Sequence, residues 1–121
     1  MTGLRRRTGI AGEEIAREYL KGQGYRIQQV NYRCRYGEID IVAWEGSLLV
    51  FVEVRTRTGT RFGEAVESIT AAKRARLGRL ARYFLTRELG REVACRVDLV
   101  AIDLDTKQGL PRINHLKGII L

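Results

Sequence analysis

Residues 37–55 read GEIDIVAWEGSLLVFVEVR, and this stretch decides the fold. Apolar residues alternate along both halves, and Gly46 with Ser47 separates them, which predicts a β-hairpin closed by a two-residue turn. Glycine is expected at the turn position that requires a positive φ. In that register the numbers of facing residues sum to 93, so Asp40 faces Glu53 with Cβ atoms about 4.5 to 5.5 Å apart.

The same alternation assigns side chains to faces of the two strands. Ile39, Ile41 and Ala43 are expected on one face of the first strand, because successive side chains of a strand point to opposite faces. Glu53 and Arg55 are expected on a shared face of the second strand. Arg55 would then stand opposite Glu38, since these numbers also sum to 93. A cross-strand ion pair between them is the plainest interpretation of Arg55.

Asp40 and Glu53 lie within apolar, β-forming sequence, where an uncompensated charge is costly. Two facing carboxylates destabilise a hairpin, and burial raises the pKa of at least one of them unless a cation neutralises the pair. Mg²⁺ or Mn²⁺ would suit such a site. Magnesium accepts few carboxylate ligands and keeps several waters, and the Val54 carbonyl could add another oxygen. The alternative is a solvated sheet face on which Glu53 pairs with Arg55 or Arg57.

Five motifs together carry a resemblance to known proteins. The chain resembles the YraN-like family of small bacterial proteins and, more widely, the PD-(D/E)xK nuclease superfamily. The matching residues are Thr8-Gly9 with Glu13, Ala16 and Leu20; Gly37-Glu38-Ile39-Asp40; Phe51-Val52-Glu53-Val54-Arg55; Ile69-Thr70 with Lys73 and Leu77; and Cys95-Arg96-Val97-Asp98.

The resemblance implies a fold and a site. The fold would be α/β with a restriction-endonuclease-like core in the order α-β-β-β-α-β, a mixed central sheet flanked by helices. Asp40 and Glu53 would bind metal, Glu13 would be an accessory acid, and Arg55 would occupy the place of the superfamily's lysine. A guanidinium stays protonated, so Arg55 can neutralise charge in a transition state but cannot take a proton from water.

Lys73 is a candidate to replace the missing lysine. With Thr70 as N-cap, Lys73 lies in the first turn of the second helix, where the helix dipole disfavours a cation. It also extends the apolar stripe of that helix toward its amino terminus. We therefore expect Lys73 to reach a phosphate or the attacking water beside Asp40 and Glu53. A solvated lysine at a helix start is the alternative.

The net charge of +8 and the sequence pI near 10.1 predict a polyanionic partner. The cations gather on the second helix, on the side away from its apolar stripe, where they can displace counterions from a phosphate backbone. DNA is favoured over RNA by the resemblance alone. The residues expected to contact nucleic acid are Arg57, Arg74, Arg76, Arg79 and Arg82.

The chain is expected to form one domain, residues 1–121, because it shows no linker, repeat or low-complexity tract. Residues 1–7 are expected to be a flexible basic arm, followed by a helix capped by Thr8. The remaining elements are expected at residues 25–33 (strand), 56–68 (loop), 71–88 (helix), 96–102 (strand) and 112–121 (a weak strand, or a strand with a tail).

Two classes of function remain. The first is a magnesium-dependent endonuclease that hydrolyses phosphodiesters in DNA, including branched or damaged DNA. The second is a binding module with the nuclease fold but no cleavage, or an RNA- or ribosome-associated factor. No stretch has the ~18 apolar residues of a membrane span. Two cysteines without zinc-type spacing favour a cytoplasmic location. The sequence does not decide whether the protein forms a homodimer.

Single acidic and imidazole groups have simpler interpretations. Asp98 and Glu13 are each expected to be structural hydrogen-bonding acids if they are not part of the site. His115 is alone in the sequence and is expected to be structural. Trp44 is expected in the core.

Overall fold

A computed structural model describes residues 2–58, 69–104, 107 and 109–120, with side chains from residue 9 onward. The sheet has five strands in the order β1-β2-β3-β4-β5. Neighbours are antiparallel except β3 and β4, which run parallel. The strands are β1 (Arg26–Cys34), β2 (Gly37–Glu45), β3 (Leu48–Arg57), β4 (Cys95–Asp103) and β5 (Arg112–Leu116).

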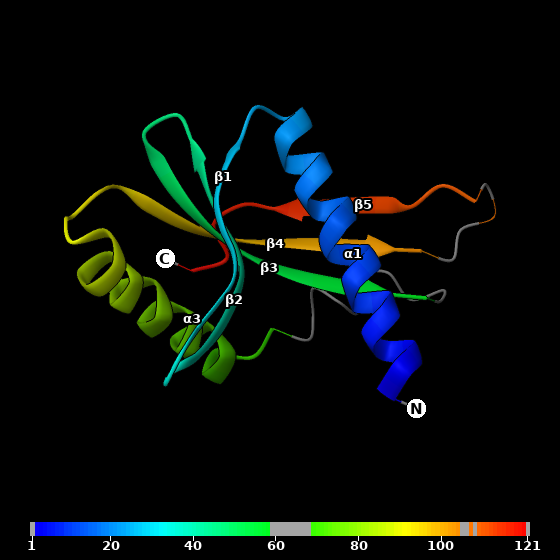
Figure 1. Ribbon diagram of the computed structural model, residues 1–121, viewed down its shortest axis with the longest axis horizontal. Helices are drawn as coiled ribbons and strands as arrows, with labels where there is room; N and C mark the ends of the chain where they lie inside the picture. Colours follow the sequence, from blue (N-terminus) through cyan, green and yellow to red (C-terminus); the bar gives the residue numbers. More distant parts are fainter. Residues whose placement is uncertain (1, 59–68, 105–106, 108, 121) are drawn as a thin grey trace.

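Helices cover the two faces of this mixed sheet (Figure 1). They are α1 (Thr2–Gly22), α3 (Ala71–Tyr83) and its π-helical continuation η1 (Phe84–Leu89). The parallel β3 and β4 are joined through α3, as expected for a β-strand, helix, β-strand crossover. The α/β class and the order α-β-β-β-α-β are therefore confirmed, and β5 is the additional strand.

Two apolar clusters hold the layers together. The first lies between the sheet and α3 and includes Phe51, Leu77 and Phe84. The second lies between the sheet and α1 and includes Leu20 and Val52. Trp44, expected in the core, is 7% exposed within the first cluster.

The hairpin of β2 and β3 has the predicted register. The facing pairs from Ile41 with Val52 to Glu45 with Leu48 all follow the predicted sum. Gly46 has φ 61°, the positive value that the two-residue turn requires.

Other element boundaries differ modestly from the expectations. The first helix begins at Thr2 rather than Thr8, so residues 2–7 are helical where an arm was expected. The second helix begins at the predicted residue, and the Thr70 hydroxyl accepts from Lys73 N at 3.1 Å as an N-cap. It ends at Gly90 with φ 72°. Of the expected loop 56–68, residues 59–68 lie outside the described part.

Gly12 brings α1 close to the end of β3. A Cβ on this glycine would overlap the Thr56 side chain, so only glycine allows this approach. The neighbouring Glu13 is thereby held above the part of the sheet that contains Asp40. Among the described residues, no helix is both long enough and apolar enough to cross a membrane.

Candidate metal and nucleic-acid site

Asp40 lies where the regular alternation of β2 breaks. Ile39 packs in the cluster under α3, whereas Ile41 packs in the cluster under α1. Two residues apart on a regular strand would share a face, so the prediction that Ile39 and Ile41 share one is wrong. Asn31 lies across from Asp40 on β1 and has φ 53°, a left-handed value that asparagine tolerates. Both strands therefore change face at Asn31 and Asp40.

The same point ends the pairing of β2 with β3. The last facing pair is Ile41 with Val52, and beyond it the Asp40 carboxylate takes over a main-chain bond. Val54 N donates to Asp40 Oδ2 at 2.7 Å. The two strands thus separate at Asp40, and the aspartate is held beside β3 by its side chain.

Asp40 and Glu53 lie close together, although the facing pairs of the hairpin end one position earlier, at Ile41 with Val52. The pKa of Asp40 is raised to about 8 by burial, by a hydrogen bond with the Glu53 carboxyl group and by the Glu53 charge. The bond from Val54 N opposes this rise. A hydrogen bond between two carboxyl groups requires a proton on one of them, so near neutral pH the pair holds a proton in the place of a cation.

Lys73 reaches this pair from α3. Its Nζ lies 3.5 Å from Glu53 Oε2, and the side chains of Lys73 and Glu53 are only 17% and 13% exposed. The Thr70 cap fixes the start of the helix and hence the position of Lys73. Lys73 is therefore not a solvated lysine at the helix start, which was the alternative interpretation.

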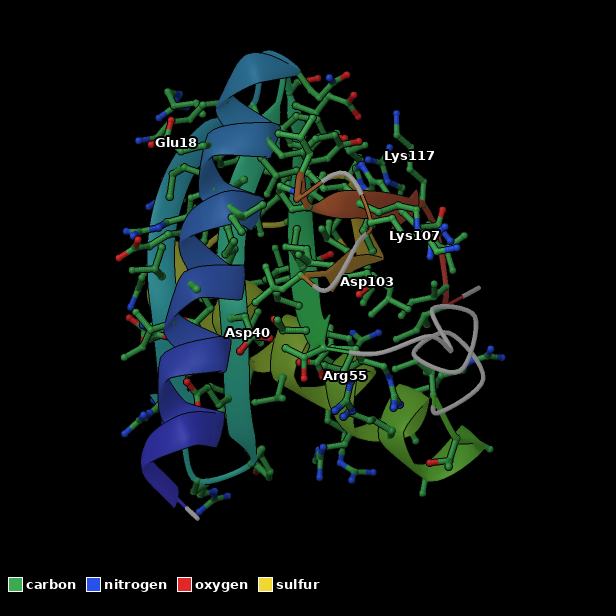
Figure 2. All side chains as sticks on the ribbon, turned by 90° about the vertical axis from the view of Figure 1, so that its right-hand side faces the viewer. Glu18, Asp40, Arg55, Asp103, Lys107 and Lys117 are labelled. Atoms are coloured by element: carbon green, nitrogen blue, oxygen red, sulfur yellow. The ribbon has the colours of Figure 1, made fainter. Side chains whose placement is uncertain are left out.

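Arg55 is not the partner of Glu38. Glu38 instead forms an exposed ion pair with Arg33, its neighbour on β1, at 3.5 Å. The expected cross-strand pair fails because β2 and β3 separate before reaching these positions. Arg55 Nε is buried without a hydrogen-bond partner among the described residues. Figure 2 shows Asp40 and Arg55 at the same end of the sheet, close to the end of β3.

Glu13 adds negative charge near the pair. Its pKa is raised by burial and by the charge of Glu38, while a hydrogen bond with Asn31 and the charges of Arg17 and Arg33 lower it. Its charge also contributes to the raised pKa of Asp40. Nevertheless, no three or more acidic, histidine or cysteine side chains gather into a metal-binding group within the described part of the chain.

The arginines expected to contact nucleic acid differ in solvent exposure. Those on α3 are all exposed, whereas Arg57 is half-buried at the last position of β3. The exposed set is Arg74, Arg76, Arg79 and Arg82.

Asp98 belongs to a different polar cluster. It is fully buried, accepts two bonds from Arg96 at 2.8 and 2.9 Å, and accepts one from Gly118 N at 3.0 Å. His115 Nε2 lies 2.8 Å from its Oδ2 and must donate, since a carboxylate only accepts. Tyr19 Oη lies 3.0 Å from the other His115 ring nitrogen. The structural interpretations of Asp98 and His115 agree with this arrangement.

Sequence reasoning missed Asn31. It lies across from Asp40, and its side chain lowers the pKa of Glu13, so it stands beside both acidic residues. The available signal was an asparagine inside an otherwise regular strand, because asparagine adopts left-handed backbone more readily than most residues.

Comparisons with known proteins agree with the YraN-like part of the resemblance. Residues 12–102 match the family described as "Uncharacterised protein family UPF0102". A UPF0102 protein of Mycolicibacterium vanbaalenii is 41% identical over 121 residues, covering 98% of this chain and 99% of its own. One of Moorella thermoacetica is 47% identical over 118 residues, covering 98% of both chains. The chain belongs to the UPF0102 family, the YraN-like proteins of bacteria.

Proposed function

We propose that the protein is a magnesium- or manganese-dependent endonuclease that hydrolyses phosphodiester bonds in DNA, including branched or damaged DNA. One observation carries the proposal. The Asp40 and Glu53 carboxyl groups come from neighbouring strands and lie close enough that Glu53 raises the pKa of Asp40. A lysine at the start of a basic helix lies 3.5 Å from Glu53 Oε2, and the side chains of this pair are largely buried. Membership of the PD-(D/E)xK superfamily is part of the proposal.

The donor set fits a hard divalent cation. Because the pKa of Asp40 is raised to about 8, the pair keeps a proton near neutral pH even with Lys73 beside it, and a bound ion would replace that proton. Two carboxylates, each binding through one oxygen, and the Val54 carbonyl would leave half the positions of an octahedral ion to water and substrate, as magnesium prefers. Such an ion lowers the pKa of bound water and polarises a phosphoryl oxygen.

The protein's own cations would act on the phosphate. Lys73 already lies against Glu53, so a phosphate oxygen beside that carboxylate is within reach of its ammonium group. The buried Nε of Arg55, at the same end of the sheet, has no partner among the described residues, and a phosphate oxygen would satisfy it. Both would neutralise charge that develops in the transition state. Arg74 and Arg76 are exposed on α3 and would hold the flanking backbone.

The second candidate is a binding module that does not cut. Arg55 favours it, because arginine stands where the superfamily has lysine and cannot act as a base. This candidate predicts affinity that falls steeply with salt but no cleavage. An RNA- or ribosome-associated role would appear as a preference for RNA in the same experiment.

The test is cleavage of labelled duplex, branched and single-stranded DNA, and of matched RNAs, with magnesium or manganese. The matched control is an Asp40→Asn, Glu53→Gln variant, which keeps the size of both side chains. The proposal expects wild-type products that require metal and vanish in the variant. Binding without products would establish the second candidate. Cleavage that persists in the variant would mean that these carboxylates are not the site.

A further inference from the structure

A cavity lies beside α3 and η1, away from Asp40 and Glu53. Its volume is about 390 Å³, within the range of sites that bind small molecules. The turn between β1 and β2 forms one wall, and α3 with η1 forms the other. Four arginines and two tyrosines dominate its lining, which contains no acidic residue: Arg35, Arg79, Arg82, Arg87, Tyr36 and Tyr83.

Gly37 places the turn against the helix. Its φ is 133°, a value that residues with a side chain rarely adopt, and an added Cβ would make only ordinary contacts with Leu80, at 3.5 Å, and with the Arg76 side chain, at 3.7 Å. Glycine therefore allows the tip of the hairpin to follow the surface of α3. As a result Tyr36 meets Tyr83 edge to face, with ring centroids 5.3 Å apart.

Flat cationic groups already cover the two rings. The guanidinium of Arg35 lies 4.9 Å from the centre of the Tyr36 ring, and that of Arg87 lies 5.9 Å from the centre of the Tyr83 ring. Both arginines are exposed, and neither forms an ion pair with a described carboxylate. A planar nucleobase can take the same position over a ring, while the displaced guanidinium turns toward a phosphate.

Position along α3 connects this cavity with the carboxylates. At about 100° per residue, Arg76, Arg79 and Tyr83 lie along one side of the helix, and Lys73 lies at the edge of that side, next to the apolar stripe. Ten residues separate Lys73 from Tyr83, which is a rise of about 15 Å. A chain of phosphates that passes Lys73 would meet exposed cations until it reached the tyrosines.

We infer that the cavity formed by Arg35, Tyr36, Arg79, Arg82, Tyr83 and Arg87 binds an unpaired segment of a nucleic acid, stacking its bases on the tyrosines. The inference rests on the proposed function only in taking nucleic acid as the polyanion. It narrows the substrate to one with a single-stranded portion a few nucleotides from the bond that is cut. A paired duplex buries its base faces and cannot stack in this way.

The test is binding of a labelled oligothymidine, measured by fluorescence anisotropy in EDTA so that no cleavage can occur. Tyr83→Leu keeps apolar bulk but removes the aromatic face, and Tyr83→Phe keeps the face. We expect Tyr83→Leu to bind at least about fivefold more weakly and Tyr83→Phe to bind within about twofold of wild type. Unfolding midpoints of both variants check that the helix is intact.

Salt dependence separates stacking from charge. Tyr83→Leu should leave the slope of log affinity against log salt unchanged, because it removes no cation. Arg82→Gln should reduce that slope by about 0.7, the contribution of one phosphate contact on a single strand. Fully paired DNA should bind Tyr83→Leu and wild type equally. Equal binding of oligothymidine by these two proteins, or an equal loss with paired DNA, would overturn the inference.

The two proposals can fail separately. Asp40→Asn with Glu53→Gln should bind oligothymidine at least as well as wild type in EDTA. If wild type cut nothing but Tyr83→Leu lost affinity for the single strand, cleavage would fail and the stacking cavity would stand. If wild type cut DNA with metal but Tyr83→Leu bound normally, the cavity would fail and the nuclease would stand.

Discussion

Two acidic clusters in the described part of the chain, one around Asp98 and one around Asp40, differ in what surrounds the carboxylate. Asp98 has four hydrogen bonds from Arg96, His115 and Gly118. Burial alone would raise its pKa, yet these partners hold the pKa below its ordinary value. Asp40 has one main-chain donor and a second carboxyl group, and its pKa is raised to about 8. Loss of solvent raises the pKa of both carboxyl groups, so the number of hydrogen-bond donors around each one decides which stays charged.

This difference in hydrogen-bond donors makes Asp98 a structural acid and leaves Asp40 suited to bind a cation. Asp98 links β4 with β5 and with the chain after it, and its charge is fully matched inside the protein. Asp40 and Glu53 can both ionise only if a positive charge arrives from outside the fold or Lys73 compensates them. The two clusters should therefore respond in opposite ways to mutation, to metal and to pH.

The largest effect is expected from Asp98→Ala. Removing this carboxylate leaves Arg96 with much less charge compensation in a low-dielectric region and should lower the free energy of unfolding by about 3 to 5 kcal/mol. Urea denaturation followed by circular dichroism measures it. Glu38→Ala, which breaks only the exposed pair with Arg33, is the matched control and should cost about 1 kcal/mol or less. Similar costs for the two variants would contradict the structural role of Asp98.

Magnesium should affect only the other cluster. An ion that binds the folded protein at 100 times its Kd stabilises it by about 2.7 kcal/mol, so the Tm should rise with magnesium concentration. The rise should vanish in Asp40→Asn with Glu53→Gln, because both side-chain donors lose their charge. Sodium chloride at equal ionic strength controls for screening. An equal rise in the variant would place the ion elsewhere.

The features of the two clusters that could be predicted from the sequence depend on residues close together in the chain. Alternation and the glycine turn decide the register of β2 and β3 within a few residues, so the meeting of Asp40 with Glu53 could be predicted. Thr70 likewise decides the start of α3 and the position of Lys73, through a cap that spans three residues.

The parts that could not be predicted depend on distant segments. The change of face at Asp40 requires the left-handed Asn31 on another strand, and it is what removes Arg55 from Glu38. The donors around Asp98 come from β4, from β5 and from the chain after β5. No short pattern contains these partners together.

The pH dependence of stability should have opposite signs at the two clusters. Because the pKa of Asp40 is raised from 3.8 to about 8, metal-free protein should lose stability as the pH rises between these values. The loss should be on the order of a few kcal/mol and should be absent in Asp40→Asn. Asp98, with a lowered pKa, contributes stability that is lost only in acid. Urea midpoints from pH 4 to 9 in EDTA measure both, and a wild-type curve that matches Asp40→Asn would refute the shared proton.

The smallest effect is expected from Lys73→Met, and it tests whether Lys73 belongs to the unmatched cluster. The 3.5 Å pair with Glu53 is largely buried, but Asp40 already shares a proton with that carboxylate, so the change should cost about 1 kcal/mol or less near pH 6. Without the ammonium group, a second negative charge on the pair becomes more costly, so the alkaline loss of stability should move to higher pH. Tyr25→Phe is the counterpart at the other cluster. It removes a 2.9 Å bond to Arg96 at a similar cost but should leave the alkaline transition in place. A transition that moves in Tyr25→Phe, or stays fixed in Lys73→Met, would mean that the two clusters are not electrostatically separate.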